Sequence, residues 1–168
     1  MSTVSVHMPS VIAVGVLLAI SAFFSSSESA IFSLADAPID AETGAGRKLQ
    51  ALRADPHRLL VTLLVGNNLV NIAITSIVTL LVARFVPPGS TVVIATLVVS
   101  GLILVFGEIV PKSYGLGHAA ASSLRVARPI SYVERLLGPL VAVFDVVTRW
   151  LTARVGGDQG IEKPYLED

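Results

Sequence analysis

The sequence predicts an all-α membrane protein with three transmembrane helices and a further helix that lies along the membrane surface. Its 168 residues are 53% hydrophobic and only 14% charged, whereas roughly 25% of the residues of a globular chain are charged. The mean hydropathy of +0.76 is also typical of a membrane protein. Three apolar runs are each long enough to cross a bilayer, which takes about 20 helical residues.

The first predicted span covers residues 9–35. Pro9 suits the first turn of a helix, and Asp36 and Pro38 end the apolar run. No lysine or arginine precedes Arg47, whereas a signal peptide has a basic start and a shorter apolar segment. We therefore expect this segment to be retained as a membrane helix.

The second and third predicted spans cover residues 59–85 and 91–111, and a tight VPPGS loop connects them. The segment before them, residues 36–58, is rich in charged side chains and is expected to lie in water or at the interface. Within it, residues 45–53 are predicted to form a short helix.

A fourth helical stretch, residues 129–155, is too charged to span a membrane easily, since Arg135, Asp145 and Arg149 interrupt it. We expect it to lie in the interface as an amphipathic juxtamembrane helix with its apolar face in lipid. These elements define one transmembrane domain over residues 1–155, followed by a polar, acidic tail over residues 156–168.

Basic residues predict the orientation, because lysine and arginine concentrate in cytoplasmic loops. Residues 36–58 carry four of them, whereas the N-terminal segment and residues 86–90 carry none. We therefore expect the N-terminus outside, and the 36–58 loop and the C-terminus in the cytoplasm. The expected location is the cell inner (plasma) membrane, as a multi-pass protein.

Composition disfavours several functions. The formal net charge is zero, so nothing indicates nucleic-acid binding. The chain has no cysteine and three scattered histidines, which disfavours thiolate and zinc sites. An enzyme is not expected, because the sequence shows no nucleophile paired with a base.

The stretch VFGEIVPKSY, residues 105–114, places the carboxylate of Glu108 in the third apolar run. Pro111 has no N–H to donate, and its ring clashes with the carbonyl four residues back, which belongs to Gly107. Carboxylate and carbonyl oxygens bind hard cations such as Mg²⁺, and interrupted membrane helices form the ion sites of transporters. Alternatively, Glu108 is protonated or paired with Lys112.

The first two spans also carry polar side chains at helical spacing. Ser21 and Ser25 are four residues apart and share a helix face, as do Asn67 and Asn71. Serine and asparagine can simply hold membrane helices together, and Glu28 can be a group at the cytoplasmic end of its helix. If neighbouring spans are antiparallel, however, these groups and Glu108 lie at similar depth and can converge.

A site of hydroxyl, amide and carbonyl oxygens with one carboxylate suits Mg²⁺, Na⁺ or Ca²⁺ better than a transition metal. A single carboxylate disfavours a tight calcium site. Intramembrane ionisable residues commonly mark ion or substrate pathways, so the three polar clusters together predict an intramembrane cation site.

Three segments resemble the three motifs of the CorC/CNNM family's transmembrane domain, in the same order and spacing: SAFFSSSESAIFSL (21–34), LLVGNNLVNIAITSI (63–77) and FGEIVPKSYG (106–115). The resemblance covers about residues 10–155. It implies magnesium transport, usually efflux, by a homodimer in the lipid bilayer, with three spans and a belt-like juxtamembrane helix per subunit. Carried over to this chain, the implied ligands are Ser21, Ser25, Asn67, Asn71 and Glu108, with the Gly107 carbonyl added by the proline argument. Asn68 is an alternative to Asn67.

The chain departs from the family pattern in two places. Ser26 stands where a glycine is common. Family members also usually continue into a cytosolic pair of CBS domains that bind ATP, whereas this sequence stops at Asp168. We therefore expect a truncated chain, in which ATP would act only through an absent CBS region.

The expected function is secondary transport of Mg²⁺, with a Na⁺ gradient as the candidate driving force. A membrane magnesium sensor that regulates another transporter would use the same ligands. An ion channel would need a continuous polar path, and residues 92–99 supply little of one.

Overall fold

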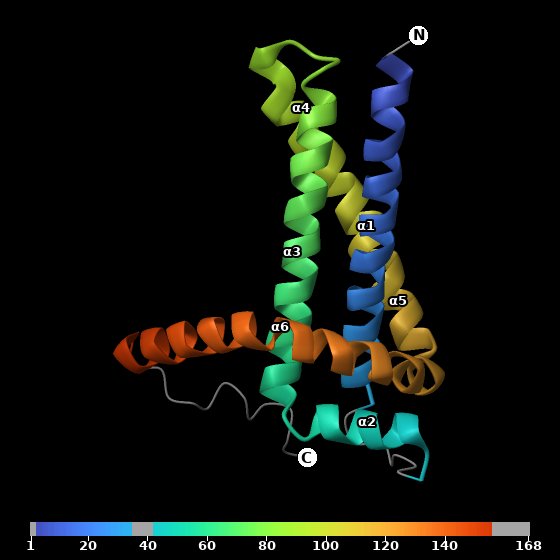
Figure 1. Ribbon diagram of the computed structural model, residues 1–168, viewed down its shortest axis with the longest axis vertical. Coiled ribbons are helices and arrows are strands. Elements are labelled where there is room, and N and C mark those ends of the chain that lie inside the picture. The colour runs from blue at the N-terminus through green and yellow to red at the C-terminus, as the bar shows by residue number, and fades with distance from the viewer. Residues whose placement is uncertain (1–2, 35–41, 156–168) are drawn as a thin grey trace.

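The computed structural model describes residues 3–34 and 42–155, and every regular element among them is helical. Figure 1 shows long upright helices crossed at one end by a long transverse helix. The elements in chain order are α1 (Thr3–Phe32), α2 (Gly44–Arg53), α3 (Pro56–Val82), α4 (Pro88–Leu102), the π-helix η1 (Ile103–Ile109), α5 (Val110–Gly117) and α6 (Ala119–Val155). The predicted all-α class is confirmed.

Three helical segments are long and apolar enough to cross a membrane: Met8–Phe32, Pro56–Val82 and Pro88–Gly117. The third consists of α4, η1 and α5, which follow one another without a break. Along its length this span passes from α3, which α4 contacts, to α1, which η1 and α5 contact. The three predicted spans are therefore confirmed, and the diagonal course of the third brings its centre next to both others.

Several predicted boundaries were wrong by a few residues. Helix α1 begins at Thr3, so Pro9 lies inside it, because a proline near the start of a helix removes one hydrogen bond without ending the helix. Its predicted end at Ala35 lies outside the described residues. Helix α3 begins earlier than predicted, since the Asp55 side chain accepts the Arg58 N–H and Pro56 occupies the first turn.

The third span also starts earlier and ends later than predicted, at Pro88 and Gly117. Pro88 occupies the first turn of α4, a position that proline favours. The chain passes through Pro111 without leaving the helix, because the backbone has shifted to a π-helical hydrogen-bonding pattern just before it. The wider turn of the π-helix accommodates Pro111, which a regular α-helix would not.

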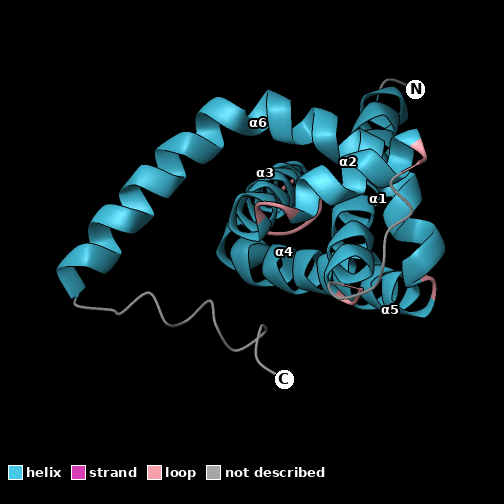
Figure 2. Ribbon diagram, turned by 90° about the horizontal axis from the view of Figure 1, so that it is seen from below, coloured by secondary structure: helices cyan, strands magenta, loops and turns pink. Residues whose placement is uncertain are grey.

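The juxtamembrane helix α6 begins at Ala119, not at residue 129, and contains both Pro129 and Pro139. Prolines inside a helix bend it, and Figure 2 shows that α6 is curved. Figure 1 shows it lying across the spans. Large apolar side chains are exposed along it, among them Leu136, Phe144 and Trp150, as expected of a helix whose apolar face meets lipid.

The larger core cluster lies where α2 and α6 meet the spans. It joins side chains from four helices: Phe24, Ile31, Leu49, Leu52, Leu59, Leu63, Ala127 and Ile130. A smaller cluster of Val14, Ile74, Val78 and Val99 holds the other half of the spans together. The larger apolar core of the described residues thus lies near α2 and α6.

Candidate intramembrane cation site

Ser21 of α1 lies between two asparagines of α3. Its Oγ is 2.9 Å from Asn67 Oδ1 and 2.9 Å from Asn71 Oδ1. Ser21 is fully buried, and both asparagines are partly buried. The structure therefore brings together three of the predicted site residues. It places Asn67, and not the exposed Asn68, beside Ser21.

A serine hydroxyl has one hydrogen to donate and can serve only one of these two amide oxygens at a time. The second oxygen then faces the lone pairs of the hydroxyl, or a cation. The two amide oxygens each lie within hydrogen-bonding distance of the serine oxygen. Oxygens gathered in this way form a region of negative potential, which in a low-dielectric surrounding favours a positive charge.

Gly107 of η1 packs directly against the same serine. A Cβ atom added at Gly107 would lie 2.8 Å from Ser21 Oγ, and Gly107 is buried. Any larger residue here would require the Ser21 hydroxyl to shift, because real Cβ atoms do not come so close to a neighbouring heavy atom. The third span therefore reaches the Ser21–Asn67–Asn71 cluster through its backbone.

The backbone at this point lacks one donor. Val110 donates its N–H to the Val105 carbonyl, five residues back, in the π-helical pattern. The next residue, Pro111, has no N–H. The carbonyl deprived of this donor is Phe106 if the five-residue pattern continues, and Gly107 if the four-residue pattern resumes. The predicted Gly107 carbonyl is thus one of two candidate backbone ligands.

Ser25, one turn along α1 from Ser21, is fully buried, and its Oγ has no hydrogen-bond partner. A buried hydroxyl left unpaired costs about 1–3 kcal/mol. The neighbouring Ser27, equally buried, avoids this cost by donating to the Phe23 carbonyl at 2.6 Å. The oxygen of the unpaired Ser25 hydroxyl is therefore available to bind a cation.

Glu108 follows Gly107 in η1 and is partly buried. Its carboxylate forms no ion pair with any described residue. The sequence suggested Lys112 as its partner. In the structure, however, Lys112 Nζ lies 3.4 Å from Glu28 Oε2, and this ion pair links α5 to α1. No described cation therefore neutralises Glu108, which follows Gly107 in the chain, whereas Glu28 is paired with Lys112.

The polar side chains further along α3 do not join the cluster. Thr75 donates its hydroxyl to the Asn71 carbonyl at 2.7 Å, and Ser76 donates to the Ile72 carbonyl at 2.9 Å. Both hydroxyls are satisfied by their own helix, so Thr75 and Ser76 add nothing to the contact among Ser21, Asn67 and Asn71.

Sequence reasoning missed the contact that holds α5 to α1. A Cβ atom added at Gly115 would lie 2.4 Å from the Ser26 carbonyl oxygen. Gly107 and Gly115 are both buried, lie eight residues apart, and approach Ser21 and Ser26 of α1 closely. Small residues are a recognised signal of close helix packing in membranes and could have revealed the contact.

The donor chemistry limits which cation could be held. Among residues 3–34 and 42–155, no group of three or more His, Cys, Asp or Glu side chains could hold a metal ion. The predicted ligands are neutral oxygens and one carboxylate, which suit hard cations rather than transition metals. Their donor types fit Mg²⁺, which takes oxygen ligands.

The fold and this cluster define a three-span helical membrane protein with a polar, oxygen-lined region between its spans. A known family has this architecture: residues 12–168 match the family described as CNNM, the Cyclin M transmembrane N-terminal domain. The chain belongs to this family, and the CorC/CNNM resemblance of its motifs is confirmed.

Curated relatives are similar over most of the chain. It is 34% identical over 159 residues to a chloroplastic DUF21 domain-containing protein of Arabidopsis thaliana, covering 91% of this chain and 24% of the relative. It is 32% identical over 155 residues to a UPF0053 protein of Haemophilus influenzae, covering 90% and 37%. It is 34% identical over 145 residues to the UPF0053 inner membrane protein YfjD of Escherichia coli, covering 82% and 33%. The chain therefore spans less than two-fifths of the length of these relatives.

Proposed function

We propose that this chain transports Mg²⁺ across a membrane, in the direction of efflux, through the Ser21–Asn67–Asn71 cluster. The observation that carries the proposal is the meeting of oxygen atoms from α1 and α3 at one buried serine, against which the third span packs. Two donors come from α3, one from α1, and η1 approaches through Gly107. Membership of the CNNM family supports the same function.

Mg²⁺ has a near-octahedral shell and dehydrates reluctantly, so it usually keeps several waters. The predicted set offers oxygens from Ser21, Ser25, Asn67, Asn71, Glu108 and the Gly107 carbonyl. These groups would replace only part of the hydration shell, and Glu108 would supply the charge that the neutral donors lack. The role of each residue is to present an oxygen; no bond is made or broken, and the protein is not proposed to be an enzyme.

The wider features of the proposal follow the sequence and the family. The transporter would work as a homodimer in the cell inner (plasma) membrane, with the N-terminus outside and Na⁺ as the coupling ion. The description of one relative as an inner membrane protein supports this location. If the chain continues into a CBS pair, as the family resemblance implies, ATP would act on transport through that region.

The test compares wild-type protein with Asn71→Ala and Glu108→Ala, reconstituted in liposomes that contain a magnesium-sensitive dye. Each substitution is expected to weaken Mg²⁺ binding and flux by about tenfold or more, because even partners outside the first coordination shell commonly contribute this much. Ser76→Ala is the matched control, since the Ser76 hydroxyl bonds only within its own helix.

Three outcomes separate the alternatives. If both variants lose binding and flux while Ser76→Ala keeps them, transport through this cluster is supported. If the wild type binds Mg²⁺ but never moves it, the chain acts as a magnesium sensor. If Glu108→Ala binds Mg²⁺ as the wild type does, the carboxylate is structural and the proposed site is wrong.

A further inference from the structure

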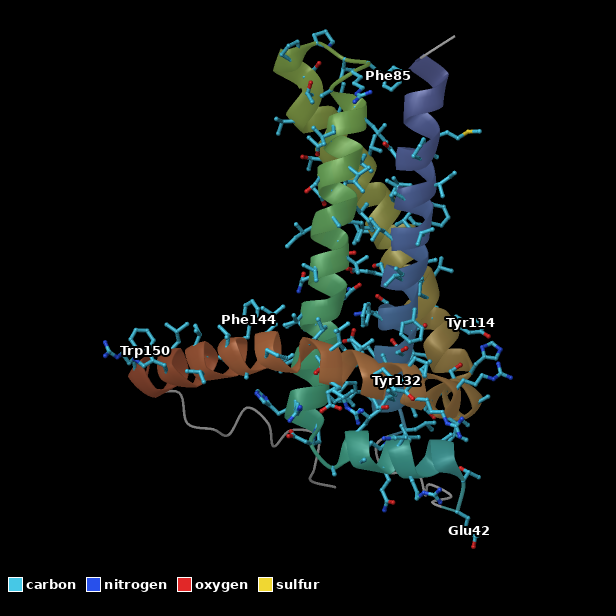
Figure 3. The ribbon with its side chains drawn as sticks, in the orientation of Figure 1. Glu42, Phe85, Tyr114, Tyr132, Phe144 and Trp150 are labelled. Carbon is cyan, nitrogen blue, oxygen red and sulfur yellow. The ribbon has the colours of Figure 1, made fainter. Side chains whose placement is uncertain are left out.

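A second polar site lies between α2 and α6, away from the cation cluster. A crevice of about 370 Å³ opens there. Figure 3 shows side chains ending in nitrogen gathered between these two helices. The crevice is lined by Lys48, Ala51, Leu52, Arg58, Ser131, Glu134 and Arg135.

The lining carries an excess of positive charge. Three basic side chains face one acidic side chain, so the formal balance is plus two. Arg58 Nε lies 2.6 Å from Glu134 Oε1, and this ion pair joins α3 to α6. Lys48 and Arg135 form no ion pair with any described residue, and both are exposed. The crevice therefore presents two cations that are available to a ligand.

Apolar surface of α6 borders the crevice. Ser131, Glu134 and Arg135 share one face of the helix, and Tyr132 and Leu136 lie on the adjacent face, about 100° further round. Tyr132 is 69% exposed and Leu136 is 80% exposed. Since α6 lies across the ends of the spans, this places a cationic crevice beside a surface suited to hydrocarbon.

We propose that the α2–α6 crevice binds the phosphate-bearing headgroup of an anionic phospholipid. The phosphate would lie between Lys48 and Arg135, and the acyl chains would extend along Tyr132 and Leu136. Basic pockets at the membrane surface bind anionic headgroups in this way. The adjoining apolar face favours a lipid over a soluble phosphate compound, which would leave that face uncovered.

The bound lipid would link two elements that are far apart in the sequence. Leu49 and Leu52 already pack α2 against Ala127 and Ile130 of α6. A headgroup held by Lys48 of α2 and Arg135 of α6 would add an electrostatic bridge beside this core. The lipid would therefore stabilise the end of the bundle that contains the larger apolar core.

The experiment measures phosphatidylglycerol and phosphatidylcholine retained by the full chain, using native mass spectrometry in a nonionic detergent with both lipids added. The wild type is expected to retain phosphatidylglycerol preferentially. The double variant Lys48→Gln/Arg135→Gln is expected to lower this retention by roughly tenfold or more, because each basic residue near a membrane surface contributes measurably to anionic lipid binding.

Two further variants keep the test decisive. Arg84→Gln removes one positive charge just beyond the far end of α3 and should leave retention unchanged. Lys48→Arg/Arg135→Lys keeps both charges and should retain lipid as the wild type does, which separates loss of charge from misfolding. Arg58 is left intact, because its ion pair with Glu134 connects two helices.

Either of two results would overturn the proposal. The first is a double variant, folded as judged by its helical circular dichroism, that keeps wild-type retention of phosphatidylglycerol. The second is full displacement of the lipid by an equal concentration of glycerol phosphate, which would identify a site for soluble phosphate compounds. Neither result bears on Mg²⁺ flux, so this proposal and the transport proposal fail independently.

Discussion

Helix α3 carries two adjacent polar layers that differ in where their hydrogen bonds go. In the first, the side chains of Asn67 and Asn71 reach across to Ser21 of α1. In the second, Thr75 and Ser76 donate to carbonyls of their own helix. The layers are one turn apart, yet only the first links two helices.

The two layers differ in whether their hydrogen bonds depend on a neighbouring helix. A hydroxyl bonded to its own helix is satisfied regardless of its neighbours. It therefore requires no partner on another helix. The amide oxygens of Asn67 and Asn71 instead have their partner on another helix. In the proposed transport, a cation would replace this partner.

The largest expected effect comes from Gly107→Ala, which directly disrupts the layer that α1 and α3 share, namely Ser21, Asn67 and Asn71. The new methyl group would press on Ser21 Oγ at 2.8 Å and displace it from both asparagines. We expect about 1–3 kcal/mol of lost stability, as is usual for overpacking, and about tenfold weaker Mg²⁺ binding. Thermal denaturation and isothermal titration calorimetry would measure the two effects.

Gly101→Ala is the matched control in the same span. A Cβ atom there would meet nothing within 4 Å, and alanine favours a helix over glycine by up to about 1 kcal/mol. We expect unchanged Mg²⁺ binding and equal or slightly higher stability. Equal losses of binding in both variants would mean that the Ser21–Gly107 contact does not matter to the site.

Ser25→Ala should have an intermediate effect that depends on the cation. Without Mg²⁺ the variant should be as stable as the wild type or more stable by about 1 kcal/mol, since it loses an unpaired buried hydroxyl. With Mg²⁺ it should gain less stability on binding than the wild type. Denaturation midpoints measured with and without Mg²⁺ would show this reversal.

The control for that variant is Ser27→Ala, which removes an equally buried hydroxyl that already has a partner. It should lower stability slightly and leave the Mg²⁺-dependent gain unchanged. If Ser25→Ala and Ser27→Ala behaved alike, the orphaned hydroxyl would not be a ligand.

The smallest effect is expected from Thr75→Val, in the layer that bonds within its own helix. Valine keeps the shape of threonine and removes only a bond to the Asn71 carbonyl, so stability should change by no more than about 0.5 kcal/mol. Mg²⁺ flux in liposomes should match the wild type. If Thr75→Val lost as much Mg²⁺ flux as Asn71→Ala, the functional layer would include Thr75, and the two layers would not differ in function.

The spans were predictable because hydropathy and length are strong signals in a membrane protein. The ends of the spans were harder to predict. Pro56, Pro88 and Pro129 each fit a helix start, but only the first two occupy one, and Pro129 lies inside α6. Proline restricts its own backbone and the preceding residue, and its neighbours decide whether a helix begins there or bends.

The candidate site was predictable in its residue types and less so in its pairings. Spacing placed Ser21 with Ser25 and Asn67 with Asn71, but the partners of Ser21 became clear only once α1 and α3 were packed. The pairing of Lys112 with Glu28 depends on how the third span crosses the first. The π-helical pattern of η1 has no distinct sequence period, so hydropathy could not reveal it.

The contact between Gly115 and the Ser26 carbonyl has a mechanical consequence. It joins α5 to α1 backbone to backbone, whereas α4, at the other end of the same span, packs against α3. A tilt of the third span relative to α1 would therefore pivot near Gly115. Gly101 lies about 21 Å from that pivot at 1.5 Å per residue, so a tilt of about 10° would displace it by about 4 Å. Glu108, half as far from the pivot, would travel half that distance.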